Sequence, residues 1–179
     1  MSQETRTNSI ERRVRENRGR NNRPAFLDAL SQVVGSNIRP DQLLNLDSTD
    51  EVLAILRSGY AAARSGGATA MRIFFSRDKT ETALRIPDSL DSSMADEPVV
   101  LWLKQSVECG AVILTARQVL RACEAIRTLD GDAVSMLSED RTQGFIFDKN
   151  DDDANETFEL SVWGSRWFVA ATTCGIAAS

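Results

Sequence analysis

The spacing of apolar residues changes at Thr69, and this change limits what the chain can fold into. Before it, apolar residues recur every three or four positions, as on one face of an amphipathic helix. This spacing predicts a helix that begins at Pro24, because proline suits a first turn, and ends at Gly35. It predicts a second helix that begins at a capping box over residues 48–51 and ends at Gly66.

After Thr69 the chain carries β-branched and aromatic runs that are too short for core helices. The run "TAMRIFFS" predicts one strand, and residues 99–103 predict a central strand that is covered on both faces. The stretch "GAVILT" predicts a further strand, followed by a helix that is capped by Thr115. The segment "GFIFDKNDDDANETFELSVW" predicts a β-hairpin, because apolar residues alternate along both of its arms.

This order of elements predicts an α+β fold, in which N-terminal helices are followed by a mainly antiparallel sheet with one inserted helix and a C-terminal β-hairpin. We expect the helices to lie on one face of the sheet. With 179 residues the chain is long enough for one domain, which we place at residues 24–179.

Residues 1–23 differ in charge from the rest of the chain. They hold seven arginines and three glutamates, a net charge of +4, whereas the remaining residues carry −9. Ile10 and Val14 alone are too few aliphatic anchors to order this segment, so we expect a flexible, disordered arm. Guanidinium groups can neutralise phosphates without reading a base sequence. The candidate nucleic-acid-binding residues of the arm are Arg12, Arg13, Arg15, Arg18 and Arg20.

The predicted hairpin contains a strongly acidic stretch, "DKNDDDANETFE", over residues 148–159. Oxygen-bearing side chains stand at positions 1, 3, 5, 9 and 12 of this window, as in an EF-hand calcium loop. Position 6, however, is Asp153 instead of glycine, and the sequence on both sides of the window predicts strands instead of the helices of an EF-hand. A solvated hairpin tip is therefore favoured, with weak cation binding as the alternative, and we assign no metal or other cofactor.

An acidic tip attracts basic protein surfaces and repels phosphate. Trp163 faces away from Phe158, Leu160 and Val162 in a regular strand, so with Trp167 it would form an exposed aromatic anchor. The alternative is that both faces of the sheet are covered. The candidate partner-binding residues are Asp148, Asp151, Asp152, Asp153, Glu156, Trp163 and Trp167.

The chain contains no histidine, which excludes serine triads, cysteine–histidine pairs and histidine-ligated metals within one copy. Cys109, Cys123 and Cys174 are widely spaced, which predicts buried free thiols. Phosphate-binding glycine loops and nucleophile elbows are also missing from the sequence. We therefore do not expect an enzyme, although an active site built from dispersed carboxylates remains an alternative.

No stretch approaches the ~20 apolar residues of a membrane span, so we expect a cytoplasmic protein without a membrane partner. The leading hypothesis is a small, non-catalytic protein that binds another protein with a basic surface through its own acidic surface. Inhibitors, immunity-type antidotes and secretion chaperones share this profile. The alternative is a nucleic-acid-associated regulatory protein that binds through the arginine-rich arm.

Overall fold

The computed structural model describes residues 3–76, 92–131, 133–150 and 157–173, and it has the expected α+β fold. Its centre is a six-stranded sheet with the order β1-β6-β5-β4-β2-β3, in which every neighbouring pair is antiparallel. The strands are β1 (Ala70–Ser76), β2 (Pro98–Trp102), β3 (Val112–Thr115), β4 (Val134–Ser138), β5 (Gly144–Asn150) and β6 (Thr157–Trp163).

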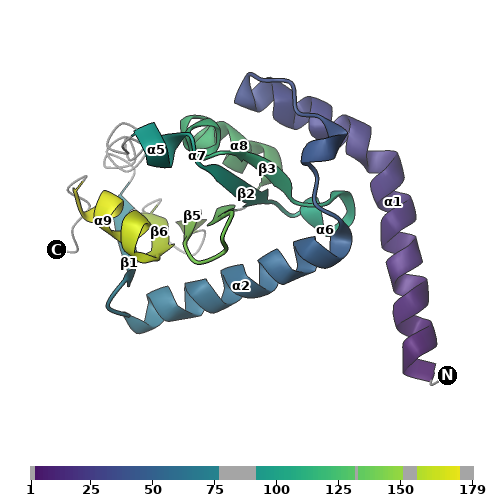
Figure 1. Cartoon of the computed structure of the whole chain (residues 1–179), viewed down its shortest axis with the longest axis horizontal. Coiled ribbons are helices and arrows are strands. Elements are labelled where there is room, and N and C mark those ends of the chain that lie inside the picture. The colour runs from purple at the N-terminus through teal and green to yellow at the C-terminus, as the bar shows by residue number, and fades with distance from the viewer. Residues whose placement is uncertain (1–2, 77–91, 132, 151–156, 174–179) are drawn as a thin grey trace.

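Helices precede the sheet, connect its strands and follow its last strand (Figure 1). They are α1 (Gln3–Val34), the 3-10 turn η1 (Pro40–Gln42), α2 (Leu46–Ser65), α5 (Ser92–Ala95), α6 (Ser106–Cys109), α7 (Ala116–Arg121), α8 (Cys123–Asp130) and α9 (Ser165–Thr173). Thr115 caps α7 as predicted, because its hydroxyl accepts a hydrogen bond from the Gln118 amide. The inserted helix is interrupted at Ala122 and therefore has two parts, α7 and α8.

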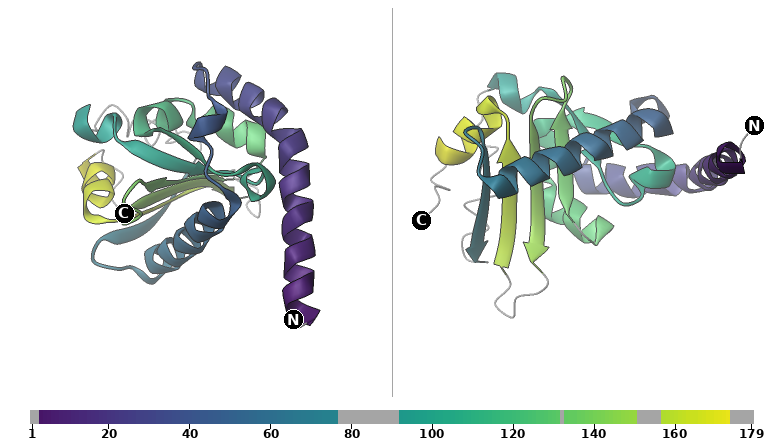
Figure 2. Two further views of the ribbon diagram at one scale, coloured as in Figure 1. Left: turned by 45° about the vertical axis from the view of Figure 1, so that its right-hand side comes forward. Right: turned by 90° about the horizontal axis from the view of Figure 1, so that it is seen from below.

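Helices cover both faces of the sheet, so the expectation that they lie on one face is wrong (Figure 2, left). The larger core lies between one face and helices α1, α7, α8 and α9. In this core Phe75, Phe147 and Phe158 stack with ring centroids 5.6 to 6.1 Å apart. The smaller core lies between the opposite face and α2.

Helix α2 begins three residues before the predicted capping box. The side chain of Asn45 accepts a hydrogen bond of 2.8 Å from the Ser48 amide, so Asn45 is the N-cap residue. The helix ends as predicted, with Gly66 in the left-handed conformation at φ +72°. Its buried side chains, which include Val52, Leu56 and Ala63, face the sheet.

The indole of Trp163 lies between Gly59 of α2 and Gly144 of β5. A Cβ atom on either glycine would lie 2.1 Å from the ring, so both positions require glycine for this close approach. Trp163 is only 7% exposed and Trp167 only 2%, since Trp167 packs beside Phe145 in the larger core. The expectation of an exposed tryptophan anchor is therefore wrong, because each ring fills the space between the sheet and a helix.

Two elements are not evident from the sequence pattern. All five residues of β4 are buried, so this strand lacks the alternation that marks a half-buried strand. Helix α9, which follows β6, docks on the larger core through Ala170 and Ala171.

We expect Gly59→Ala to destabilise the protein by about 1–3 kcal/mol, because the new methyl group overlaps the Trp163 ring. In a helix without this contact the same change would stabilise by up to about 1 kcal/mol. Urea unfolding measures the difference. Gly67→Ala is the matched control, since its Cβ would make only an ordinary 3.5 Å contact with Ala70, and equal effects of the two changes would contradict the wedged position of Trp163.

Candidate functional site

Helix α2 crosses the sheet obliquely and leaves the strand ends nearest the β5–β6 hairpin tip uncovered (Figure 2, right). The strand register aligns one residue from each of five strands in a row across this face: Trp102, Ser135, Ile146, Ser161 and Arg72. The next residues toward the tip are Asp148, Glu159 and Phe74. We call these eight residues, together with Tyr60 of α2, the open face.

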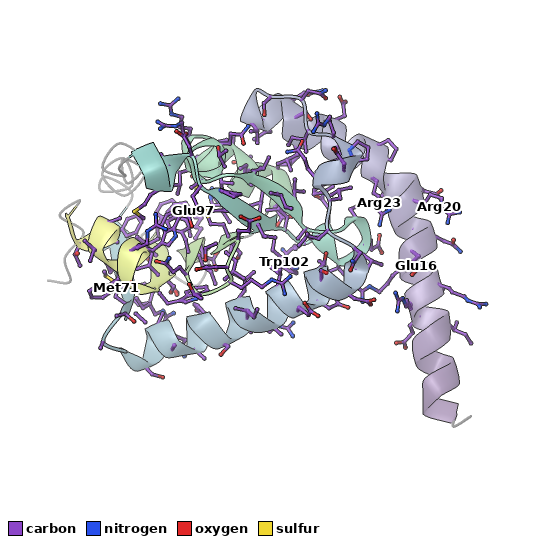
Figure 3. The ribbon with its side chains drawn as sticks, in the orientation of Figure 1. Glu16, Arg20, Arg23, Met71, Glu97 and Trp102 are labelled. Atoms are coloured by element: carbon purple, nitrogen blue, oxygen red, sulfur yellow. The ribbon has the colours of Figure 1, made fainter. Side chains whose placement is uncertain are left out.

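A hollow of about 120 Å³ lies between α2 and the row. Trp102 is placed between β2 and α2 (Figure 3), and its buried indole N–H has no acceptor among the described residues. Aromatic and arginine side chains around an apolar hollow are typical of the residues that dominate protein–protein binding. The residues that line the hollow include Leu53, Leu56, Arg57, Tyr60, Trp102 and Ile146.

Arg72 and Glu159 form an ion pair on the open face, with 2.5 Å between Nη2 and Oε2. Ser161 donates a second hydrogen bond of 3.1 Å to this carboxylate, and Arg72 also donates one of 3.4 Å to the hydroxyl of Tyr60. Burial raises the pKa of Glu159, but the hydrogen bonds from Arg72 and Ser161 outweigh it, so the pKa lies below its usual value. Burial and the nearby carboxylate raise the pKa of Tyr60. At neutral pH Glu159 is thus an ionised, fully engaged carboxylate.

The predicted hairpin is confirmed, since β5 and β6 pair from Gly144↔Trp163 to Asn150↔Thr157. Asp148 lies at the end of β5, opposite Glu159 on the open face. The other acidic candidates, Asp151, Asp152, Asp153 and Glu156, lie outside the described residues.

The environment of residues 148–159 differs from that of a calcium loop. Strands flank the window, as expected, and Arg72 already binds Glu159, which would be the bidentate ligand at position 12. Within the parts of the chain that the structure describes, no three or more Asp, Glu, Cys or His side chains gather as a metal site.

The predicted flexible arm is helical from Gln3 onward, so this expectation is wrong for the described residues. Helix α1 continues through Pro24, and its ribbon is bent (Figure 1), as is typical of helices with proline in their interior. The arginines in front of Pro24 contact carboxylates of α2 and α6. The ion pairs are Arg12–Asp47 at 2.9 Å, Arg15–Asp50 at 2.8 Å and Arg18–Glu108 at 3.4 Å.

Helix α1 also binds the last backbone carbonyls of α6. Arg15 donates a hydrogen bond of 2.8 Å to the Val107 carbonyl, and Arg23 donates one of 2.9 Å to the Cys109 carbonyl. A Cβ atom on Gly19 would lie only 1.9 Å from the Glu108 carbonyl oxygen, so the two backbones are in direct contact. Carbonyl groups at a helix end lack intrahelical partners, and cations near them are favourable. These polar contacts order a segment that buries little apolar surface.

Two of the candidate phosphate-binding arginines are both exposed and without an ion pair among the described residues. Arg13 and Arg20 make no ion pair with the described residues, and Arg20 points away from the sheet (Figure 3). Ile10, nearer the N-terminus, is 63% exposed on the part of α1 that projects from the domain. The ion pairs of Arg12, Arg15 and Arg18 therefore neutralise part of the basic charge of this segment within the chain.

A hollow of about 670 Å³ lies beside α1, α6 and α8. Burial raises the pKa of the Cys109 thiol at its wall, which keeps this group protonated and unreactive. Glu108 is held by Arg18 and Asn22, at 3.4 and 3.2 Å. The described lining therefore offers no free acid–base pair. Cys109 and Cys123 are buried free thiols as predicted, and Cys174 lies outside the described residues.

We expect Gly19→Ala to detach the first half of α1, because the new Cβ would overlap the Glu108 carbonyl. Amide hydrogen exchange should become faster over residues 3–18, although alanine by itself favours a helix by about 1 kcal/mol. Asn17→Ala, at an exposed position of the same helix, is the control and should leave exchange unchanged or slower. Equal exchange in both variants would contradict docking through Gly19.

We expect Glu159→Gln to reduce the free energy of unfolding at pH 7 by about 1–3 kcal/mol, because hydrogen bonds to a charged group are lost. The folded protein holds the pKa of Glu159 below its unfolded value of about 4.5, so this stability is present above that pH and disappears as the pH falls through the folded pKa. Wild type and variant should therefore converge in acid denaturation profiles. Asp41→Asn, which breaks an exposed pair with Arg39, should change little, and a constant gap between wild type and Glu159→Gln down to pH 2 would be inconsistent with this assignment.

No helix within the described ranges is long and apolar enough to cross a membrane. Comparisons with protein-family models, with curated proteins and with solved structures give no match.

Proposed function

We propose that this chain is a small, non-catalytic cytoplasmic protein that binds another protein through its open face and the acidic hairpin beside it. The supporting observation is the hollow rimmed by Arg57, Tyr60 and Trp102 on the part of the sheet that α2 leaves uncovered. An inhibitor, an immunity-type antidote or a secretion chaperone would use such a surface.

The charge around the hollow favours a partner with a basic surface. Asp148 belongs to the open face, and the sequence between β5 and β6 carries four further acidic residues. An apolar side chain of the partner enters the hollow, and basic side chains around it meet the hairpin. Opposite charges at the rim increase the association rate, whereas the buried contacts determine how slowly the complex dissociates.

A binding role also fits the state of the polar groups on this surface. Glu159 is held by Arg72 and Ser161, so it is not available as a general base. The unsatisfied indole N–H of Trp102 is the kind of donor that an incoming acceptor can satisfy.

Nucleic-acid binding through α1 is the weaker candidate. Arg12, Arg15 and Arg18 already form ion pairs with carboxylates of this chain. These ion pairs would have to break before the arginines could contact phosphate. No observation on the described residues favours it over protein binding.

The first experiment isolates the protein from its native cells on a mild affinity tag, with nuclease, and identifies any stoichiometric protein by mass spectrometry. With that protein as the probe, Asp151→Asn, Asp152→Asn and Asp153→Asn together should lower the association rate about fivefold or more at low salt and reduce its salt dependence. The control removes three exposed acidic charges elsewhere, by Asp28→Asn, Asp41→Asn and Glu139→Gln. Equal effects of both sets, or a partner that is lost with nuclease, would contradict the proposal.

A second variant tests the hollow separately from the charge. Leu53→Lys places an ammonium group at its wall and should speed dissociation about tenfold or more, as at the centre of an interface. Ala61→Lys, at an exposed position of the same helix, is the matched control. If Leu53→Lys keeps the wild-type dissociation rate and remains folded by circular dichroism, the partner does not use the hollow.

A further inference from the structure

The two edges of the sheet differ in how they are covered. Residues just before α2 run along the β3 edge: Leu43 bridges to Val112, and the Leu44 amide donates a hydrogen bond of 2.8 Å to the Ala111 carbonyl. The side chain of Gln42 adds one of 3.0 Å to the Ile113 carbonyl. At the opposite edge, β1 pairs with β6 and with no other described strand.

The alternating hydrogen-bond pattern of β1 shows which of its backbone groups do not pair with β6. The Gly164 amide donates to the Thr69 carbonyl at 2.9 Å, and the register continues without a bulge from Ala70 to Ser76. Because bonded and non-bonded pairs alternate in an antiparallel ladder, residues 71, 73 and 75 bond to β6. Residues 72, 74 and 76 therefore direct their N–H and C=O groups outward, without a partner among the described residues, whereas the Ala70 amide donates a hydrogen bond of 3.2 Å to the Gly67 carbonyl.

Strand β1 itself lacks the features that normally prevent strand addition. Native edge strands are protected by proline, lysine, bulges or short length, whereas β1 has seven residues and none of these. Its one charge, Arg72, is already paired with Glu159. Phe74 is 52% exposed at the middle of the edge, and the Arg72 guanidinium lies 4.5 Å from the centre of its ring.

The sequence of β1, "AMRIFFS", is complementary to itself when read in both directions from Ile73. In an antiparallel pair centred on Ile73, Arg72 stands opposite Phe74 of the second copy, and Met71 stands opposite Phe75. Ala70 and Ser76, both small, stand opposite each other. The outward-directed residues 72 and 74 then form hydrogen-bonded pairs, and Ile73 forms the non-bonded pair at the dyad, as the ladder requires.

We propose that a second copy of this chain pairs with β1 along this edge and joins the two sheets about a two-fold axis at Ile73. The register brings each Arg72 to the Phe74 ring of the partner, so the cation–π contact seen within one chain is repeated across the interface. A register centred on Arg72 would oppose two like charges. One centred on Phe74 would pair only five residues of each strand instead of seven. This inference is independent of the proposed binding function, since it concerns the edge of the sheet and not the hollow.

Disulfide trapping in the full-length protein tests the register. In a Cys174→Ser background, Ile73→Cys should give a covalent dimer on mild copper–phenanthroline oxidation, because non-bonded antiparallel pairs place their Cα atoms about 4.5 Å apart. Met71→Cys is the matched control, because residue 71 lies on the same face of the same strand but stands opposite Phe75. This variant should remain monomeric on a gel run without reducing agent. A dimer trapped by Met71→Cys or Phe74→Cys, but not by Ile73→Cys, would overturn the register.

Charge substitutions test the same pairing without cysteine. Phe74→Glu and Phe74→Lys both remove the ring, and sedimentation measures their effect on the dimer. In each copy the new side chain stands opposite Arg72 of the other copy, so the carboxylate attracts this arginine and the ammonium group repels it. The dimer dissociation constant should be about tenfold or more higher for the Lys variant. Val169→Lys, at an exposed position of α9, is the control for added charge and should match wild type. A wild-type monomer at a chain concentration of about 100 μM, or equal constants for the Glu and Lys variants, would overturn the proposal.

Discussion

The position of Trp163 between Gly59 and Gly144 determines where α2 crosses the sheet, and most of the molecular surface follows from that crossing. The indole fills the space between helix and sheet so closely that α2 cannot slide toward the hairpin without losing the contact. Residues Ala70, Trp163, Gly144, Leu137 and Val100 form the row beneath the helix. The next row, from Trp102 to Arg72, is partly covered, and in the one after it Phe74 is exposed and Asp148 half-buried, whereas Glu159 is buried. The hollow beside Tyr60 and Trp102 therefore results from the way α2 packs on the sheet.

The sequence carried enough information for the type and order of most elements, because these depend on local pattern and capping. Thr115, Gly66 and the alternating arms of the hairpin each act over a few residues, and each was read correctly. Strand β4 was missed because burial on both faces removes its alternation. The arginine-rich segment was misread because its order comes from charged groups and from one glycine contact to α6, which composition cannot reveal.

The candidate site was predictable only in part for a related reason. The acidic hairpin is one continuous stretch, so its location at the end of the sheet followed from the pattern of residues 144–163. The hollow, in contrast, takes its walls from α2, β2 and β5, and only the register brings Trp102 and Ile146 next to Tyr60. The burial of Trp163 could not be read from alternation alone, because a face that points away from one core still faces a second core when α2 covers it. Trp167 is buried for another reason, since it lies on α9 and packs into the larger core.

The β3 edge is covered by Leu43, Leu44 and Gln42, and this limits how far added copies can extend the sheet. A sheet with two open edges can recruit copies without limit and grow into a fibre, because each added copy presents a fresh edge. Here one edge is capped from within the chain, so a copy that joins at β1 presents only its own capped edge outward. Growth by strand addition would thus end at two copies, because the fold covers the only other edge of the described sheet, while concentration would set only how much of the chain is paired.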